Sequence, residues 1–184
     1  MDSKKLLALL GSILVLLLIL LGEEVPSSNV TPNESRTDSE VVRSTVAYPI
    51  VEVVDGDTVK ISVNGKIETY RLIGVDTPET VHPTKGVECF GVEASNRAKT
   101  ILTGEKVFIE TDSSQGTYDK YNRRLAYIFL EDGTNLNLKM IREGYAHEYT
   151  YSLPYKYQLQ FKEAEVAARS NKVGLWADNA CTVS

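Results

Sequence analysis

The sequence predicts a mainly β domain of the α+β class, built from a five-stranded barrel and three helices. Five short segments of β-branched or alternating apolar residues are separated by turn residues, which is typical of strands. Three other segments have helical spacing of apolar residues or a capping residue at their start. Three strands precede the first helix, two follow it, and the other helices come last. This order is typical of an OB-fold barrel with C-terminal additions.

The first three strands are expected over residues 45–54, 59–63 and 66–74. Asp-Gly-Asp-Thr turns the chain after the first strand, and Asn64-Gly65 is a strong hairpin signal between the other two. Alternation in the third strand places Arg71 on one face with the apolar Ile67 and Ile73. An arginine on an apolar face usually has an anionic partner, because an unpaired buried guanidinium is costly.

The remaining elements are expected as a helix at 92–102, strands at 107–111 and 125–130, a short helix ending at Gly144, and a last helix at 157–170. The first helix is amphipathic at helical spacing. Asn135 is a suitable N-cap for the short helix. Trp176 follows the last helix, and we expect it in the core.

Two segments precede this domain. In residues 1–22, Lys4 and Lys5 come before an apolar run of 16 residues at 6–21, and two glutamates follow. This pattern predicts a signal peptide or a signal anchor, with the rest of the chain outside the cell or on the outer face of the cytoplasmic membrane. The length of the run fits either a cleaved signal or a retained membrane anchor.

Residues 23–44 are rich in Ser, Thr, Asn, Glu and Pro, so we expect a disordered acidic tether. The domain itself is expected at 45–184. Residues 1–44 hold four of the 20 basic and six of the 25 acidic side chains, so the domain keeps a formal charge of −3. A passive nucleic-acid-coating protein is usually basic. A polyanionic ligand would therefore need a local basic patch or a metal ion.

The sequence contains two cysteines, Cys89 and Cys181. In an exported chain they could form one disulfide, and the alternative is two free thiols. A structural zinc site is not expected, because no suitably spaced histidines accompany them.

Carboxylates and an arginine are concentrated between residues 53 and 79. Asp57 lies in the first turn, Arg71 in the third strand, and Asp76 and Glu79 just after it. The hairpin brings the two acidic turns to one end of the sheet. Oxygen ligands of this kind suit Ca²⁺, and Arg71 with Arg123 would supply positive charge for a phosphate.

Four motifs together resemble the staphylococcal nuclease (thermonuclease) family over most of residues 46–180. They are VVDGDTVK, YRLIGVDTPET followed by HPTKGVE, DKYNRRLAYI and GLW. The resemblance implies an OB-fold domain and a Ca²⁺-dependent endonuclease, a hydrolase of DNA and RNA phosphodiester bonds. It also implies metal-assisted attack of water and 3′-phosphorylated products.

The family's site residues are carried over by position. Asp57, Asp76 and the Thr77 carbonyl resemble the metal ligands, and Arg71 and Arg123 resemble the phosphate-binding arginines. Glu79 resembles the residue that contacts the attacking water, either as general base or by positioning it. Asn122 replaces the family's usual glycine, and Asn is the next most tolerant residue of positive φ.

The resemblance also implies substrate-binding residues and partners. Lys120 and Tyr121 resemble positions near a terminal phosphate, and either Tyr149 or Tyr151 matches a base-stacking tyrosine. The tyrosines could instead pack a long connection to the barrel. DNA and RNA are the implied partners, single-stranded or denatured, with a membrane if residues 6–21 are retained. A monomer is expected.

Two other functions fit parts of the pattern. One is a catalytically inactive nuclease-like OB module that binds nucleic acid or protein. The other is a surface Ca²⁺-binding domain, which export and acidity would suit. Neither requires both Arg71 and Arg123 beside the acidic residues, so a nuclease is the preferred interpretation.

Overall fold

The computed structural model describes residues 41–80 and 86–181, which fall within one compact unit. The predicted signal or anchor at 1–22, and the predicted tether up to residue 40, lie outside the described residues. Among the helices that are described, none is long and apolar enough to cross a membrane.

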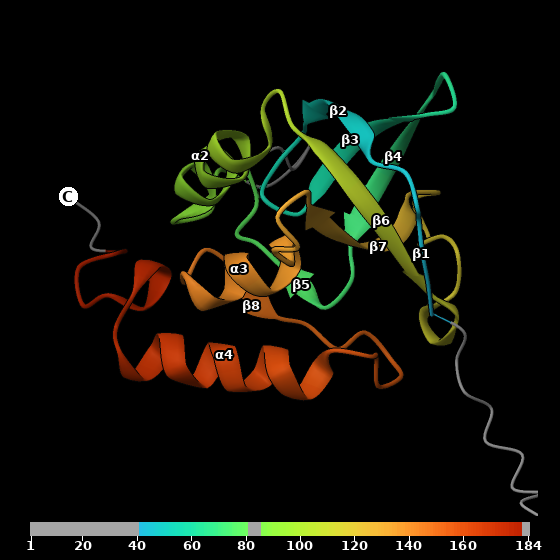
Figure 1. Cartoon of the computed structure of the whole chain (residues 1–184). Coiled ribbons are helices and arrows are strands. Elements are labelled where there is room, and N and C mark those ends of the chain that lie inside the picture. Colours follow the sequence, from blue (N-terminus) through green and yellow to red (C-terminus); the bar gives the residue numbers. More distant parts are fainter. Residues whose placement is uncertain (1–40, 81–85, 182–184) are drawn as a thin grey trace, which may run out of the picture. The chain divides into compact units, whose positions relative to one another are not determined.

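Five strands form the barrel (Figure 1). They are β2 (Tyr48–Val53), β3 (Thr58–Val63), β4 (Lys66–Leu72), β6 (Lys106–Asp112) and β7 (Arg124–Leu130). Neighbouring strands run in the order β2-β3-β4-β7-β6, and β6 pairs again with β2 to close the barrel. The β4–β7 pair is parallel and the others are antiparallel. The predicted five-stranded OB-fold barrel is confirmed.

The hairpin between β3 and β4 follows the predicted turn, since Asn64 and Gly65 both have positive φ. The two faces of β4 alternate as predicted, with Tyr70 and Leu72 on one face and Arg71 on the other. Tyr70 and Leu72 are buried, whereas Ile67 on the Arg71 face is 63% exposed. Alternation separates the two faces of a strand but does not say which one meets the core. In β4 the face of Tyr70 and Leu72 does. Arg71 therefore lies outside the barrel interior.

Three α-helices accompany the barrel, as predicted: α2 (Gly91–Leu102), α3 (Leu136–Arg142) and α4 (Gln158–Ser170). The side chain of Asn135 caps α3 by accepting from the Leu138 amide. Figure 1 shows α3 between the barrel and α4. Helix α4 buries Phe161 completely, and that ring packs edge-on against Tyr127 of β7. Short 3-10 turns lie at Ser113–Gln115 (η1) and Gly174–Trp176 (η2).

The boundary predicted for the tether differs from the structure. Val41–Arg43 form strand β1, which pairs with the end of β6. Strand β2 covers β6 only at Val107 and Lys106, so the backbone groups at the other end of β6 are open to pairing. Arg43 also donates to Glu110 at 2.7 Å and lies over the Phe129 ring. Composition alone did not reveal this short edge strand.

Two further features differ from the prediction. A second small sheet joins β5 (Val75–Asp76) to β8 (His147–Glu148), and strands of two residues carry no periodic signal in a sequence. Trp176 is half-buried outside the main core, between Arg169 and the His147 ring. The expectation that it belongs to the core was wrong, because a charged and a polar partner cover it instead.

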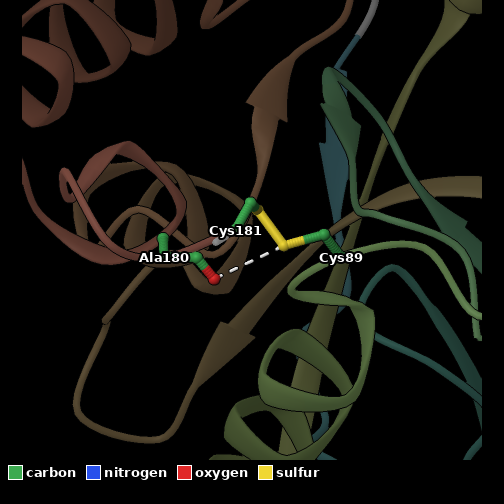
Figure 2. The surroundings of a disulfide bond; sticks show 3 residues. All are labelled: Cys89, Ala180 and Cys181. Atoms are coloured by element: carbon green, nitrogen blue, oxygen red, sulfur yellow. Dashed lines mark hydrogen bonds between the residues drawn. A yellow bond between two sulfur atoms is a disulfide. The ribbon is translucent and has the colours of Figure 1, made fainter. Parts of the chain in front are cut away.

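Cys89 and Cys181 are joined by a disulfide bond (Figure 2). The bond links the segment before α2 to the C-terminal segment, across a sequence separation of 92 residues. Cys89 Sγ also lies 3.4 Å from the Ala180 carbonyl oxygen, as Figure 2 shows. The predicted alternative of two free thiols does not apply to this structure.

Candidate active site

Asp57 connects the turn after β2 to the segment after β4. The residue is only 6% exposed, and its carboxylate accepts hydrogen bonds from the Thr77 amide and hydroxyl, both at 3.1 Å. The Thr58 hydroxyl donates to its other oxygen at 2.9 Å. Gly56 fits this contact, because a Cβ there would lie 2.7 Å from the Thr77 methyl group. The Asp-Gly-Asp turn and the Asp-Thr-Pro-Glu segment are thus fixed against each other.

Arg71 bridges the two aspartates that the sequence predicted as metal ligands. Its Nη2 lies 3.0 Å from an oxygen of Asp57 and 3.0 Å from an oxygen of Asp76. Its Nη1 donates to the carbonyls of Leu72 and Val75. The side chain is 13% exposed, so four polar partners hold a largely buried guanidinium. The anionic partner expected for Arg71 is therefore present twice.

The donor set around Arg71 fits a hard cation. Asp57, Asp76 and the Thr77 carbonyl offer oxygen atoms, the ligand type that Ca²⁺ prefers. The position of Arg71 Nη2 shows that one positive charge lies between both carboxylates. Within 41–80 and 86–181, however, no three His, Cys, Asp or Glu side chains gather closely enough to hold a metal. A metal here would need carbonyl or water oxygens to complete its coordination.

Asp55 is an acidic residue of this site that the sequence interpretation did not name. It accepts the Asp57 amide at 3.0 Å. Burial, reinforced by the neighbouring Asp57 carboxylate, raises the pKa of Asp55 to about 6. The Asp-Gly-Asp motif could have indicated that Asp55 belongs to the site, because two aspartates separated by one residue in a tight turn lie close together.

Arg123 approaches the same region from the loop before β7. Asp119 accepts both its backbone amide, at 2.9 Å, and its Nε, at 2.7 Å. Its Nη1 donates to the Thr58 hydroxyl at 3.1 Å, and that hydroxyl donates in turn to Asp57. Burial alone would raise the pKa of Asp119, but the hydrogen bonds from Arg123 outweigh it and lower that pKa. Asn122 has φ +62°, the conformation for which its residue type is suited.

Arg124 takes a different position from Arg123. Its Nη1 lies 3.1 Å from both carboxylate oxygens of Glu68 on β4. Of the two adjacent arginines, Arg123 is the one linked to Asp57, through the Thr58 hydroxyl.

A cavity of about 370 Å³ lies next to the ion pair of Arg71 and Asp76, both of which line it. Seven of the predicted site residues line it: Arg71, Asp76, Lys120, Tyr121, Arg123, Tyr149 and Tyr151. The Tyr149 and Tyr151 ring centroids are 6.4 Å apart, so the structure brings both candidate stacking residues to the same wall. Tyr118 and Gln115 also line the cavity, and the sequence interpretation did not name them.

Three predicted residues are not part of the cavity lining. Asp57 is ion-paired to Arg71, which does line the cavity, and Thr77 is hydrogen-bonded to Asp57. Glu79 is half-buried, and its Oε1 accepts the Thr80 amide at 3.0 Å. The Glu79 amide donates to Glu88 Oε2, also at 3.0 Å. These hydrogen bonds tie Glu79 to the segment that leads into α2.

Comparison with known proteins identifies the family. Residues 69–178 match the model for staphylococcal nuclease homologues. The thermonucleases of Staphylococcus hyicus and Staphylococcus intermedius are each 40% identical, over 71% of this chain and 76% of their own. The SPbeta prophage-derived endonuclease YokF of Bacillus subtilis (strain 168) is 39% identical over 68% of this chain, which covers 42% of that protein. With its OB-fold barrel and the arginine and aspartate pairs described above, this chain belongs to the staphylococcal nuclease family.

Proposed function

We propose that this protein is a Ca²⁺-dependent nuclease that hydrolyses phosphodiester bonds of DNA and RNA and leaves 3′-phosphorylated products. The observation that carries the proposal is the convergence of Arg71 and Arg123 on one cavity beside the Asp57–Asp76 pair. The two arginines are 52 residues apart in the sequence. Arg71 is ion-paired with Asp57, and Arg123 donates to the Thr58 hydroxyl, which donates to Asp57. Relatives named thermonuclease and endonuclease support the same activity.

The two arginines bind the phosphate in this mechanism. A guanidinium presents two parallel N–H donors that match two phosphate oxygens, and the match strengthens as charge builds on those oxygens. Arg71 exchanges its bonds to Asp57 and Asp76 for the phosphate. Arg123 keeps its orientation, because Asp119 holds its Nε and backbone amide. Bound Ca²⁺, held by Asp57, Asp76 and the Thr77 carbonyl, would supply further positive charge to the reacting phosphate.

Glu79 acts on the water that attacks phosphorus. The water oxygen forms a bond to phosphorus while the bond from phosphorus to the 5′-oxygen breaks, and the phosphate stays on the 3′-oxygen. A proton leaves the water toward Glu79, and a proton from solvent neutralises the 5′-oxygen. Glu79 Oε1 accepts the Thr80 amide, so in this proposal the side chain exchanges that bond for the water.

The cavity walls suit a single-stranded or denatured nucleic acid. The domain carries no net positive charge, so binding depends on Arg71, Arg123 and Lys120 in the lining. Tyr121, Tyr149 and Tyr151 offer rings for bases, and ring stacking tolerates any base sequence. This combination favours an enzyme that cuts many sequences.

We also propose that the protein acts as a monomer outside the cell, either secreted or anchored by residues 6–21. The basic and apolar pattern of residues 1–22 supports export. The disulfide between Cys89 and Cys181 is compatible with an oxidising compartment, where such bonds persist. The mature N-terminal sequence, determined on protein from the host, distinguishes a cleaved signal from a retained anchor.

The experiment that tests the activity uses heat-denatured DNA with Ca²⁺ or with an excess of chelator. We expect acid-soluble nucleotides only with Ca²⁺, and large losses in the Asp57→Asn and Arg123→Ala variants. Leu159→Ala is the matched control, since Leu159 is 73% exposed on α4 and outside the cavity lining. A wild-type protein that binds Ca²⁺ yet releases no nucleotide would falsify the proposed function.

A further inference from the structure

Tyr118 is an aromatic residue of the cavity that none of the site motifs required. It lines the cavity together with Arg71 and Arg123, and the residue is 52% exposed. Burial of a tyrosine ring is favourable, so a ring left half-exposed in a concave site keeps surface available to a ligand.

Arg124 holds the Tyr118 ring in place. The guanidinium carbon of Arg124 lies 5.6 Å from the Tyr118 centroid and 5.9 Å from the Tyr70 centroid. Glu68 fixes that guanidinium through Nη1 and also accepts the Tyr70 hydroxyl at 2.7 Å. The backbones of Tyr118 and Arg124 are joined by a β-bridge. The ring is therefore a supported surface and not the end of a freely moving side chain.

The charge of Arg124 is already used within this cluster. Its partner Glu68 neutralises it, and Tyr70 and Tyr118 lie on the cation. A phosphate at Arg124 would have to displace Glu68. The exposed ring of Tyr118, rather than the guanidinium of Arg124, is therefore the group available to a ligand here.

The cavity has aromatic residues from two separate segments. Tyr118 and Tyr121 come from the loop before β7, whereas Tyr149 and Tyr151 follow β8. The phosphate-binding Arg71 and Arg123 line the same cavity. A nucleic-acid strand has a base on each side of every phosphate, and unpaired bases can stack on such rings.

We propose that Tyr118 is the stacking platform of a second nucleotide subsite, which binds the base across the scissile phosphate from the base on the Tyr149 and Tyr151 wall. This inference rests on the proposed function and specifies its substrate class. The preferred substrate is a single-stranded oligonucleotide that fills both subsites. A mononucleotide ester fills one, and the bases of a duplex are already paired and stacked.

The experiment compares two substrates with Tyr118→Ala, Tyr118→Phe and the Leu159→Ala control. One substrate is an eight-nucleotide single strand, and the other is a mononucleotide p-nitrophenyl phosphodiester. Loss of one stacked base is expected to lower kcat/KM on the oligonucleotide roughly five- to a hundredfold, mainly through KM. The mononucleotide ester changes less than twofold, and Tyr118→Phe retains wild-type values because the ring remains.

A second readout measures binding without hydrolysis. An oligonucleotide containing 2-aminopurine is titrated with the full chain in excess chelator, where stacking on a ring quenches its fluorescence. Tyr118-dependent quenching supports the subsite even if wild-type protein hydrolyses nothing, in which case the proposed function alone fails. Equal loss on both substrates, equal quenching by Tyr118→Ala and wild type, or identical behaviour of the Ala and Phe variants overturns the subsite.

Discussion

Glu79 and Glu88 hold each other through a reciprocal pair of hydrogen bonds. The Glu79 amide donates to Glu88 Oε2 at 3.0 Å, and the Glu88 amide donates to the Glu79 carbonyl at 2.8 Å. Gly91 completes the contact, because a Cβ there would lie 2.8 Å from the Glu79 carbonyl oxygen. The segment that carries the proposed water-contacting residue is thus fixed by Glu88 and by Gly91, the first residue of α2.

The Glu88→Ala substitution is expected to lower kcat about tenfold with little change in KM, because misplacement of a reacting group slows chemistry more than binding. Glu88 would act as a positioning residue for Glu79, without contact to the substrate. Steady-state kinetics on denatured DNA measures the effect. The neighbouring Glu93→Ala, an exposed position on α2, is the control and should resemble wild type. A Glu88 variant that changes KM alone would contradict the positioning role.

Loss of the disulfide is expected to destabilise the fold by about 2–4 kcal/mol, since the bond constrains the unfolded chain over a long loop. Cys89 adjoins Glu88, so the loss should also reduce kcat. Urea unfolding of the wild-type chain with and without reductant measures the stability. The Cys89→Ser, Cys181→Ser double variant should have the same unfolding midpoint as the reduced protein, and reductant should not change it. Equal midpoints for oxidised and reduced wild type would count against this.

Ca²⁺ is expected to raise the melting temperature, because a ligand that binds only the folded state stabilises it by about 2.7 kcal/mol at a hundredfold excess over Kd. Thermal unfolding at increasing Ca²⁺ concentration measures this. The shift should vanish in Asp57→Asn, which removes one carboxylate of the pair bridged by Arg71. Mg²⁺ at equal ionic strength is the control for general screening. A shift that persists in Asp57→Asn would place the ion elsewhere.

The adjacent arginines should respond differently to the same substitution. Arg123→Lys is expected to lower kcat/KM about a hundredfold or more, because lysine lacks the planar fork that pairs with phosphate. Arg124→Lys should leave the mononucleotide ester nearly unchanged, since Arg124 is paired with Glu68. Both variants keep the charge, so each controls for the other. Equal losses on the mononucleotide ester would argue against the distinct positions of the two side chains.

The sequence predicted the barrel and the acidic turn beside Arg71 because these depend on local patterns, whereas the resemblance to a family supplied most of the other candidate site residues. Asn64-Gly65, the alternation around Val59 and Ile61, and the acidic turn at Asp57 each appear in a short window. Long-range contacts had no such signal. The β1 strand at Val41–Arg43 depends on an open edge of β6, and the contact of Tyr118 with Arg124 depends on a bridge formed only in the fold.

Trp176 illustrates the same limit. A single tryptophan in a short domain usually belongs to the core, but here Arg169 and His147 cover it at the surface. Arg71 illustrates the converse. The predicted requirement for an anionic partner is confirmed, because desolvation of a guanidinium demands one whichever face of the strand it occupies.

Asp112 should control the acid stability of the barrel. It is buried on β6 and accepts the Tyr127 hydroxyl at 3.0 Å, the Lys156 amide at 3.0 Å and the Ser114 amide and hydroxyl. Burial by itself would raise the pKa of Asp112, but these hydrogen bonds outweigh burial and lower that pKa. Its stabilising effect is therefore complete above the unfolded-state pKa of about 3.9 and disappears as pH falls through the folded-state pKa.

Asp112→Asn is expected to destabilise the protein at pH 7 by about 2–4 kcal/mol, since a buried acceptor of several hydrogen bonds loses its charge. Between about pH 4 and pH 2 the loss of stability should be shallower in the variant, because its residue 112 no longer takes up a proton. Urea unfolding across that pH range measures both effects. The exposed Glu163→Gln variant on α4 is the matched control and should follow wild type. Parallel pH curves for wild type and Asp112→Asn would show that the carboxyl has the same pKa in folded and unfolded chains.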